Sequence, residues 1–365
     1  MKLFSIPADF NTDTIDRYVE LNHQYNNYMV YETYGQYDST INIPTGRLSH
    51  PIVDYNTFER YVKYSYTKGI QFNYLLNGSI IDNYELTPDG IHKIKQLILS
   101  LFNIGIKVFT VTLFPIIEII NSLNIEVELV VSTIAQVSNL ELASYYIENK
   151  VKRIVLSECI NRDFKTLKQL CKYTNCNYEL IVNSMCFINC PFRNMHYNQI
   201  SIDFGKDINE ISKSYYPNRC IMRRNKCSSN YMKLAFIRPE DVSSYEAVGI
   251  KYFKIQGRQA IKHGNIYKTV ETYFKESYEG NLLRLLDCFI QGNSTNNIYI
   301  DNKDLEGFIN KFINSQCELN CQECKHCENY AKSSLKSSSS LLTTINQHVQ
   351  KNDLFVIENE KECLK

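Results

Sequence analysis

The sequence lacks an excess of charge of either sign. It carries 40 Lys and Arg residues against 39 Asp and Glu residues, so its formal net charge is +1. A protein that wraps long nucleic acid needs a broad basic field, and this composition does not supply one. The balance excludes bulk DNA binding and leaves room only for a local basic cleft.

Long apolar runs are missing as well. The most apolar stretch, 104–120, is interrupted by Lys107 and Pro115 and ends beside Glu118, so we expect no transmembrane helix and no membrane partner. The opening residues MKLFSIPADFNTDTID contain acids where a secretory signal peptide needs an unbroken apolar region. We therefore expect a cytoplasmic protein.

Cysteine, by contrast, is abundant, with 13 residues. Disulfide frameworks are typical of small secreted chains, whereas this chain has 365 residues. We expect the thiols to be reduced and to act as ligands, nucleophiles or buried apolar residues.

Short apolar runs predict a series of strands that are covered on both faces. The predicted strands are 3–6, 70–76, 106–113, 125–131, 153–156, 179–182, 200–204, 234–237 and 252–255. Helical patterns lie between several of them, at 55–68, 88–104, 140–149, 163–173 and 239–247. The clearest helix has Thr87 as its N-cap and Pro88 at its first position, and it stops at Gly105.

Alternating strands and helices indicate parallel βα units, in either a closed barrel or an open doubly wound sheet. No GxGxxG turn follows the first strand, which favours an α/β fold with a (β/α)8 TIM-barrel-like core over residues 1–279. Residues 280–365 are rich first in Asn, then in Cys and then in Ser. We interpret them as a Cys-rich C-terminal appendage.

Polar residues follow the predicted strands at the end where a TIM barrel builds its active site. They are Asn73, Asn77, Thr112, Ser132, Thr133, Ser157, Glu158, Asn183, Ser184, Arg238, Gln256, Gly257 and Arg258. This polarity is unusual directly after apolar runs, and it predicts a functional site at this end of the barrel.

Four thiols lie close together in the appendage. Cys317, Cys321, Cys324 and Cys327 are separated by three, two and two residues. Such spacing suits a tetrahedral zinc or an iron–sulfur cluster, because a tight loop brings several thiolates to one centre. The spacing alone does not separate the two, and a reduced surface loop is the simpler alternative.

A second group of thiols follows the predicted strand 179–182. Cys186 and Cys190 lie just beyond the strand end, and Cys220 and Cys227 come later. Two sulfurs three residues apart can bind one metal centre; the alternative is that they are small buried apolar residues. We interpret the remaining thiols as ordinary core or surface residues, namely Cys159, Cys171, Cys176, Cys288 and Cys363.

Three stretches of the chain resemble the collagenase-like peptidase family U-32. They are LIVNSMCFINCPFRNMHYN, FIRPEDVSSYEAVGIKYFKIQGR, and VVSTIAQV leading to RIVLSECINRDFKTL. The strand FNYLLN and the Cys-rich tail resemble one branch of this family, and together the likeness covers most of 45–330. The better understood members are iron–sulfur proteins that hydroxylate without dioxygen, and some of them take the oxygen from prephenate.

This resemblance implies an oxidoreductase, an oxygen-independent hydroxylase, with one or two 4Fe-4S clusters and with zinc as the alternative in the tail. By position, Cys186, Cys190 and Cys220 match cysteines of this branch, and the fourth ligand is either Cys227 or a tail thiol. The donor would be prephenate or a similar small carboxylate. The acceptor would be a small molecule, a carrier-bound intermediate, a peptide or RNA, and a homodimer or a heterodimer with a family member is also expected.

A dicarboxylic donor needs cations to bind it. Five cationic residues fall at or just after predicted strand ends, namely Arg162, Arg193, Arg238, Lys254 and Arg258. The alternative for each is a structural ion pair, for example between Arg238 and Glu240 or Asp241, or between Arg162 and Asp163. The candidates for moving protons are Asp241, Glu158 and His196.

Other functions stay open. An RNA hydroxylase should present a basic stripe, for which the dense candidate is Arg219, Arg223, Arg224 and Lys226. A peptidase, as the family name implies, needs an activated nucleophile or a metal-bound water. The sequence has no HExxH or GxSxG motif, and His196 as a base for Cys186 is a weaker interpretation than Cys186 as a ligand. A zinc-stabilised binding module is the third class.

Overall fold

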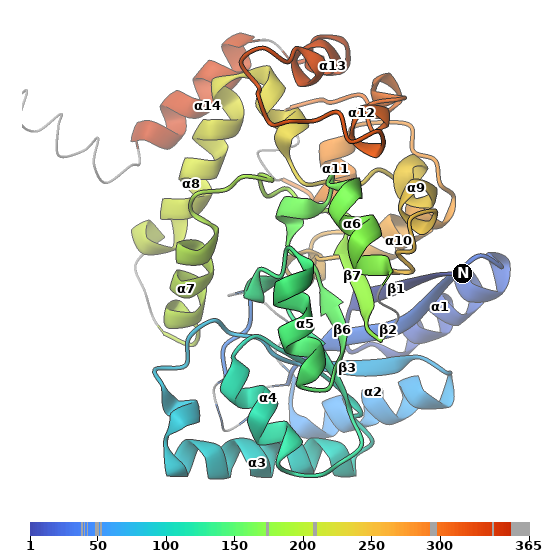
Figure 1. Ribbon diagram of the computed structural model, residues 1–365, viewed down its shortest axis with the longest axis vertical. Helices are drawn as coiled ribbons and strands as arrows, with labels where there is room; N and C mark the ends of the chain where they lie inside the picture. Colours follow the sequence, from blue (N-terminus) through green and yellow to red (C-terminus); the bar gives the residue numbers. More distant parts are fainter. Residues whose placement is uncertain are drawn as a thin grey trace, which may run out of the picture.

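Eight parallel strands form a closed barrel at the centre of the molecule (Figure 1). The computed structural model describes residues 1–37, 39, 41, 43–47, 51, 53–172, 175–206, 210–292, 298–337 and 339–351. The strands are β1 (Lys2–Pro7), β2 (Tyr28–Gly35), β3 (Gln71–Leu76), β4 (Val108–Val111), β5 (Glu128–Val131), β6 (Val151–Val155), β7 (Asn177–Ile181) and β8 (Tyr252–Lys254). Each strand pairs with the next, and β8 closes on β1 with Phe4 opposite Phe253. The predicted (β/α)8 TIM-barrel-like fold is confirmed.

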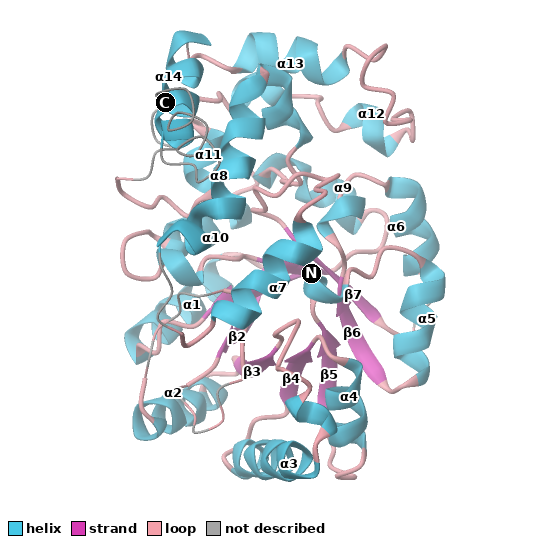
Figure 2. Ribbon diagram, turned by 90° about the vertical axis from the view of Figure 1, so that its left-hand side faces the viewer, coloured by secondary structure: helices cyan, strands magenta, loops and turns pink. Residues whose placement is uncertain are grey.

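Helices surround the barrel (Figure 2). They include α1 (Thr12–Gln24), α2 (Tyr55–Thr67), α3 (Pro88–Asn103), α4 (Phe114–Asn121), α5 (Leu140–Glu148), α6 (Phe164–Cys171) and α10 (Ile266–Phe274). Helix α3 begins as predicted, because the Thr87 hydroxyl accepts a hydrogen bond from the Gly90 backbone N–H at 3.0 Å. Ile94, Ile98 and Leu101 on the apolar stripe of α3 are fully buried in the core.

The barrel interior contains a buried charged layer below an apolar one. Arg153 is fully buried and lies 2.5 Å from Glu32 Oε2, 2.9 Å from Glu128 Oε1 and 3.4 Å from Glu179 Oε2. Glu32 also accepts a hydrogen bond from the Ser5 hydroxyl at 2.6 Å. A buried charge is stable only when it is paired and hydrogen-bonded, so this layer ties β1, β2, β5, β6 and β7 together.

Two predicted strands are wrong and one strand was not predicted. Residues 200–204 belong to the end of α7 (Arg193–Asp203), and 234–237 form an extended segment outside the barrel, with a single antiparallel bridge between Leu234 and Phe187. The strand that was not predicted is β2, which follows α1 and whose apolar run is interrupted by Glu32. Since Glu32 finds its partner, Arg153, far along the chain, the local pattern did not reveal this strand.

The connection 182–251, between β7 and β8, is a large insertion. It contains α7, α8 (Glu210–Lys226), the 3-10 helix η4 (Ser228–Lys233) and α9 (Val242–Glu246). The C-terminal residues add α11 (Leu282–Leu286), α12 (Asn310–Ile313), α13 (His326–Ser334) and α14 (Ser339–Lys351). Helix α14 packs along α8, and α13 packs on η4, at the top of the view in Figure 1.

Barrel and tail share one apolar core, which extends from Phe4 to Leu342. The tail therefore packs on the barrel insertion over a continuous contact. Among the residues that the structure describes, no helix is both long enough and apolar enough to cross a membrane.

Candidate functional site at the barrel mouth

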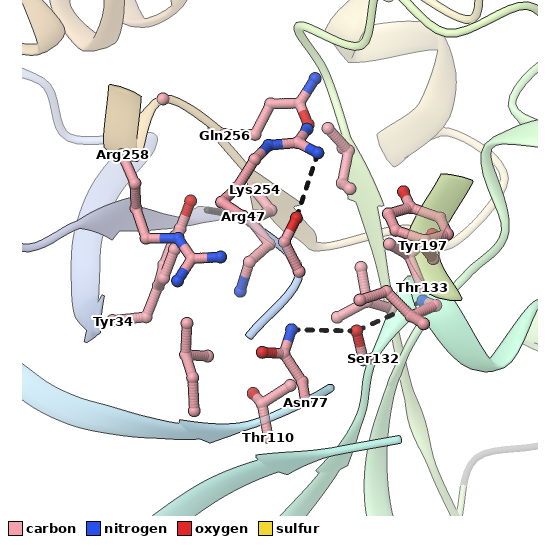
Figure 3. Close-up of a pocket in the computed structure, with 16 residues that line it drawn as sticks. Tyr34, Arg47, Asn77, Thr110, Ser132, Thr133, Tyr197, Lys254, Gln256 and Arg258 are labelled. Atoms are coloured by element: carbon pink, nitrogen blue, oxygen red, sulfur yellow. Dashed lines mark hydrogen bonds between the residues drawn. The ribbon is translucent and has the colours of Figure 1, made fainter. Parts of the chain in front are cut away.

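A small polar pocket of about 60 Å³ lies at the carboxyl ends of the strands (Figure 3). Several of the polar residues predicted for this end line it, namely Asn77, Thr133, Ser132, Gln256, Gly257 and Arg258. The Asn77 side-chain amide donates to the Ser132 hydroxyl at 3.2 Å, which joins the ends of β3 and β5. These six of the polar strand-end residues therefore share one pocket, and a functional role for them stays a prediction.

Two buried cations face this pocket, Lys254 at the end of β8 and Arg258 in the turn that follows. Arg258 donates to the Thr45 hydroxyl at 2.8 Å, and burial lowers its pKa to about 10, so it stays charged at neutral pH. Lys254 is 8 % exposed, and its Nζ lies 3.9 Å from the centre of the Tyr34 ring. Burial also lowers the pKa of Lys254, because the low-dielectric surroundings disfavour its charged form.

A third cation, Arg47, was not foreseen from the sequence. Its guanidinium donates to the Gln256 side-chain oxygen at 2.6 Å and lines the same pocket (Figure 3). Arg47 lies in a segment between β2 and α2 with no recognisable motif, so only the folded chain places it at the mouth. Tyr34 was missed because it lies on β2, which was not predicted, and Tyr197 because it lies on α7, which was not predicted as a helix.

The first group of thiols lines a second cavity, of about 450 Å³, next to the polar pocket. Cys186 and Cys190 reach it from the loop after β7, and Cys220 reaches it from α8. Arg47, Tyr197 and Gln256 line both cavities and form their common wall. The structure therefore brings three of the four predicted ligands of this group to one place beside the buried cations.

These thiols differ in their electrostatic surroundings. Burial raises the pKa of Cys186. A hydrogen bond from the Cys220 thiol lowers the pKa of Cys190 to about 6, and it holds the proton on Cys220. Because a thiolate is the form that binds metals, Cys190 is the thiol of this group that is best prepared to act as a ligand.

The fourth predicted member, Cys227, does not line the cavity. It is exposed at the start of η4, and its Sγ lies 3.1 Å from the Ser229 hydroxyl. Cys159, which the sequence suggested was an ordinary thiol, instead lines a groove of about 530 Å³ together with Cys190 and Arg193. Cys159 follows β6, so it approaches the thiol group from the neighbouring strand end.

Three other predicted residues lie around the thiols. His196, on α7, lines the thiol cavity, and burial together with the charge of Arg47 lowers its pKa to about 4. Glu158 is fully buried, with Oε2 3.3 Å from the Thr133 hydroxyl and 3.8 Å from Arg193 Nε. Arg193 also donates to the Phe187 carbonyl, so it fixes the loop that carries Cys186 and Cys190.

The structure does not bring Arg162 to the pocket. Its guanidinium donates to the Leu234 carbonyl at 2.6 Å and lies over the rings of Phe236, Phe308 and Phe312, at 4.6, 4.8 and 5.1 Å. These contacts attach α12 to the barrel insertion. Arg162 is therefore buried between the barrel and the tail, and neither cavity at the mouth includes it.

Arg238 and Asp241 are likewise placed elsewhere, and they pair with each other. Arg238 Nε and Nη2 lie 3.0 and 3.1 Å from the two Asp241 oxygens, and Arg238 Nη1 donates to the Asn302 carbonyl at 2.8 Å. Both side chains are buried. This bidentate contact favours the structural ion-pair interpretation of Arg238, and it leaves Asp241 away from the polar pocket.

All four tail thiols line one pocket, of about 300 Å³. Lys311 donates to the Cys324 sulfur at 3.2 Å, and the backbone N–H of His326 and this lysine lower the pKa of Cys324. Within the described part of the chain, no three His, Cys, Asp or Glu side chains converge as tightly as one bound metal ion requires. The two thiol groups are thus gathered around cavities and do not form a closed single-ion site.

Fold and site define a class of protein: a closed (β/α)8 barrel with a cationic pocket and three thiols at its mouth. The profile described as Peptidase family U32 matches residues 47–281, and the chain belongs to this family. A protein of Methanocaldococcus jannaschii described as an uncharacterized protease is 31% identical over 294 residues, which cover 80% of this chain and 86% of that protein. A U32 peptidase of known structure has the same fold, with a TM-score of 0.52 and 14% identity over 70% of this chain and 93% of that one.

Proposed function

We propose that this U32 protein is an iron–sulfur-dependent, oxygen-independent redox enzyme of the hydroxylase kind. The observation that supports it is the shared wall between two cavities, one lined by Cys186, Cys190 and Cys220 and the other by buried cations. A redox centre held by the thiols would lie beside a small carboxylate held by the cations. Prephenate or a similar carboxylate is the proposed oxygen donor.

The thiols fit a cluster better than a single ion. A tetrahedral zinc draws its sulfurs to about 2.3 Å from one centre, and the described thiols do not converge in that way. A 4Fe-4S cluster is larger than one ion, and the cavity of about 450 Å³ lined by these thiols offers room for it, provided that Cys190 and Cys220 give up the hydrogen bond between them. Cys186, Cys190 and Cys220 would hold it, and when bound it would supply one-electron transfer at the mouth of the barrel.

The chain's own residues have separate tasks in this proposal. Arg258 binds the donor carboxylate, because its fixed guanidinium suits that geometry, and Lys254 holds a second oxygen of the donor. Arg193 fixes the thiol loop through the Phe187 carbonyl. Glu158, whose Oε1 lies 3.5 Å from the Ser184 hydroxyl after β7, is the proton acceptor beside this loop.

Peptidase activity is the second candidate, and the description of the Methanocaldococcus jannaschii relative as a protease favours it. The thiol that would serve as nucleophile is Cys190, whose pKa is about 6. Cys190 would already be a thiolate near neutral pH, but the leaving amine needs a proton donor, and His196, whose pKa is about 4, carries no proton to give at that pH. The surroundings of Cys190 therefore support its role as a metal ligand better than a role as a peptidase nucleophile.

RNA modification receives less support from the surface. Of the basic run on α8, Arg223 donates to the Asn189 carbonyl at 3.1 Å, and Arg224 lines the thiol cavity. These two arginines are turned toward the thiol loop, so fewer cations remain for a phosphate backbone than the run suggested.

The test is anaerobic purification followed by iron and sulfide counts, visible absorbance and consumption of prephenate. We expect iron and sulfide in equal amounts, a broad visible band, and prephenate consumption that Arg258→Met reduces. The exposed Arg60→Met variant is the matched control and should behave as the unmodified protein. A colourless protein that contains only zinc would overturn the proposal, and peptide cleavage by such a preparation would favour the peptidase.

A further inference from the structure

The proposed function uses the amine of Lys254 only to hold an oxygen of the donor, and the surroundings of this amine point to a further role. Its side chain is more than nine-tenths buried, and its Nζ has no hydrogen-bond partner among the described residues. Figure 3 shows the Lys254 amine projecting into the polar pocket, near Asn77 and Arg258. A buried amine without a partner costs free energy, so its retention at the mouth of the barrel calls for a ligand.

We propose that Lys254 is a nucleophile that condenses with the ketone of a 2-oxo acid bound in the polar pocket. This inference rests on the proposed function and deepens it, because it names the chemical class of the donor: a carboxylate with an adjacent ketone. Lys254 binds the ketone carbon covalently, and Arg258 binds the carboxylate next to it.

The surroundings of Lys254 suit an amine that can lose its proton. Burial disfavours the ammonium, and Arg153 and Arg258 act in the same direction, while Glu179 and Glu32 favour the charge. The net effect on the pKa is downward. A lysine must be unprotonated to attack a carbonyl, and enzymes reach that state by burial and by nearby cations.

The size of the pocket fits the head group of such an acid. The pocket of about 60 Å³ is small, which suits the head group of a short acid such as pyruvate. A longer 2-oxo acid would extend past Arg47 and Gln256, which also line the larger thiol cavity.

The step is balanced without an added oxidant or reductant. The nitrogen lone pair of the neutral amine forms a bond to the ketone carbon, the two N–H protons pass to the carbonyl oxygen, and this oxygen leaves as water. The product is an imine between Lys254 Nζ and the former ketone carbon. This imine withdraws electrons from the neighbouring carbon atoms, and water returns the free acid and the amine.

The test uses the full chain, pyruvate and sodium borohydride, which reduces an imine to a stable amine. We expect the mass of the protein to increase by one reduced pyruvate unit and peptide mapping to place it on Lys254. Lys254→Arg should abolish the adduct. Lys251→Arg, at the exposed start of the same strand, should keep it. Arg258→Met should weaken trapping by pyruvate about tenfold through the lost contact with the carboxylate.

The wild-type peptide map keeps the test valid even if Lys254→Arg does not fold. No adduct, or adducts spread over exposed lysines, would overturn the inference. The trapping needs no cluster, so its failure is separate from that of the proposed function. Iron and prephenate consumption without an adduct would reject the imine alone, whereas an adduct on a protein free of iron would keep Lys254 as a nucleophile and reject the redox role.

Discussion

The guanidinium of Arg162 lies 2.6 Å from the carbonyl of Leu234 and packs against the rings of Phe308 and Phe312 in the tail. This contact joins the end of β6 to the insertion between β7 and β8. Arg162 thus belongs to the interface on which the tail packs, although its sequence position suggested a donor-binding residue. Replacing it should therefore affect folding more than substrate affinity.

We expect Arg162→Met to lower the free energy of unfolding by about 3 kcal/mol, because buried carbonyl groups lose their donors. Denaturant unfolding measures this change, with Lys165→Met on the exposed face of α6 as a control within about 0.5 kcal/mol of the wild type. If Arg162→Met had unchanged stability and a raised KM for the donor, Arg162 would be a donor-binding residue as the sequence suggested.

The pair formed by Arg238 and Asp241 gives a second prediction. Removing either partner leaves an uncompensated buried charge, so Arg238→Met and Asp241→Asn should each cost about 3–5 kcal/mol of stability. The double variant should cost less than the sum, because it leaves no lone charge. The same cycle on the surface pair Lys63 and Glu59, whose atoms are 2.7 Å apart, should give less than about 1 kcal/mol of coupling.

Activity separates the structural role of Asp241 from a catalytic one. The Arg238–Asp241 pair does not line the polar pocket, so the folded fraction of Asp241→Asn should keep the wild-type rate. Loss of the rate without loss of stability would place Asp241 in the chemistry.

The barrel fold could be predicted from the sequence because most of its strands and helices are defined by local patterns. Thr87 and Pro88 mark the start of α3, and the polar strand ends from Asn77 to Arg258 correctly locate the mouth. Strand β2 was missed because Glu32 interrupts its apolar run and is stabilised inside the barrel by partners on other strands, such as Arg153 and Ser5. Such partners are fixed by the folded chain and have no local signature.

The sequence predicted that cysteines and arginines form the candidate site, but it predicted less well which individual cysteines and arginines belong to it. Spacing grouped Cys186 with Cys190, and their loop does place both on one cavity. Arg47 and Cys159 came to the site from other strand ends. Arg47 has no motif around it, and Cys159 lies in the stretch RIVLSECINRDFKTL but far along the chain from Cys186 and Cys190. Arg162 follows β6, whereas Arg238 follows an extended segment outside the barrel, and tail residues supply partners to both.

The buried carboxylates of the barrel predict a dependence of stability on pH. Burial and the neighbouring Glu179 raise the pKa of Glu128 to about 7, above its ordinary 4.5. The folded state thus holds the proton more tightly than the unfolded state, so stability should fall as the pH rises from 4.5 to 7. The side chain is 31% exposed, so we expect a loss of only about 1–2 kcal/mol.

Glu128→Gln should remove most of this pH dependence, because an amide does not titrate. The measurement is the unfolding free energy at several pH values, and Glu141→Gln on the exposed face of α5 should retain the wild-type slope. An unchanged slope in Glu128→Gln would assign the effect to other groups of the charged layer.

Iron content should distinguish one cluster from two. We expect Cys186→Ser to abolish activity and lower the iron content, and Cys321→Ser to lower the iron content by removing a thiol of the tail pocket. Cys171→Ala, a half-buried thiol that lines neither pocket, serves as the control. Unchanged iron in Cys321→Ser, with zinc lost from the same variant, would assign the tail to zinc.

The fourth ligand of the first thiol group can be identified in the same assay. Cys227 points its sulfur to Ser229 and lies outside the cavity, whereas Cys159 lines a groove with Cys190. We therefore expect Cys159→Ser to lower iron content and visible absorbance and Cys227→Ser to leave both near the wild-type values. The opposite result would mean that η4 rearranges when the cluster binds, because Cys227 could then reach Cys220 only by leaving its contact with Ser229.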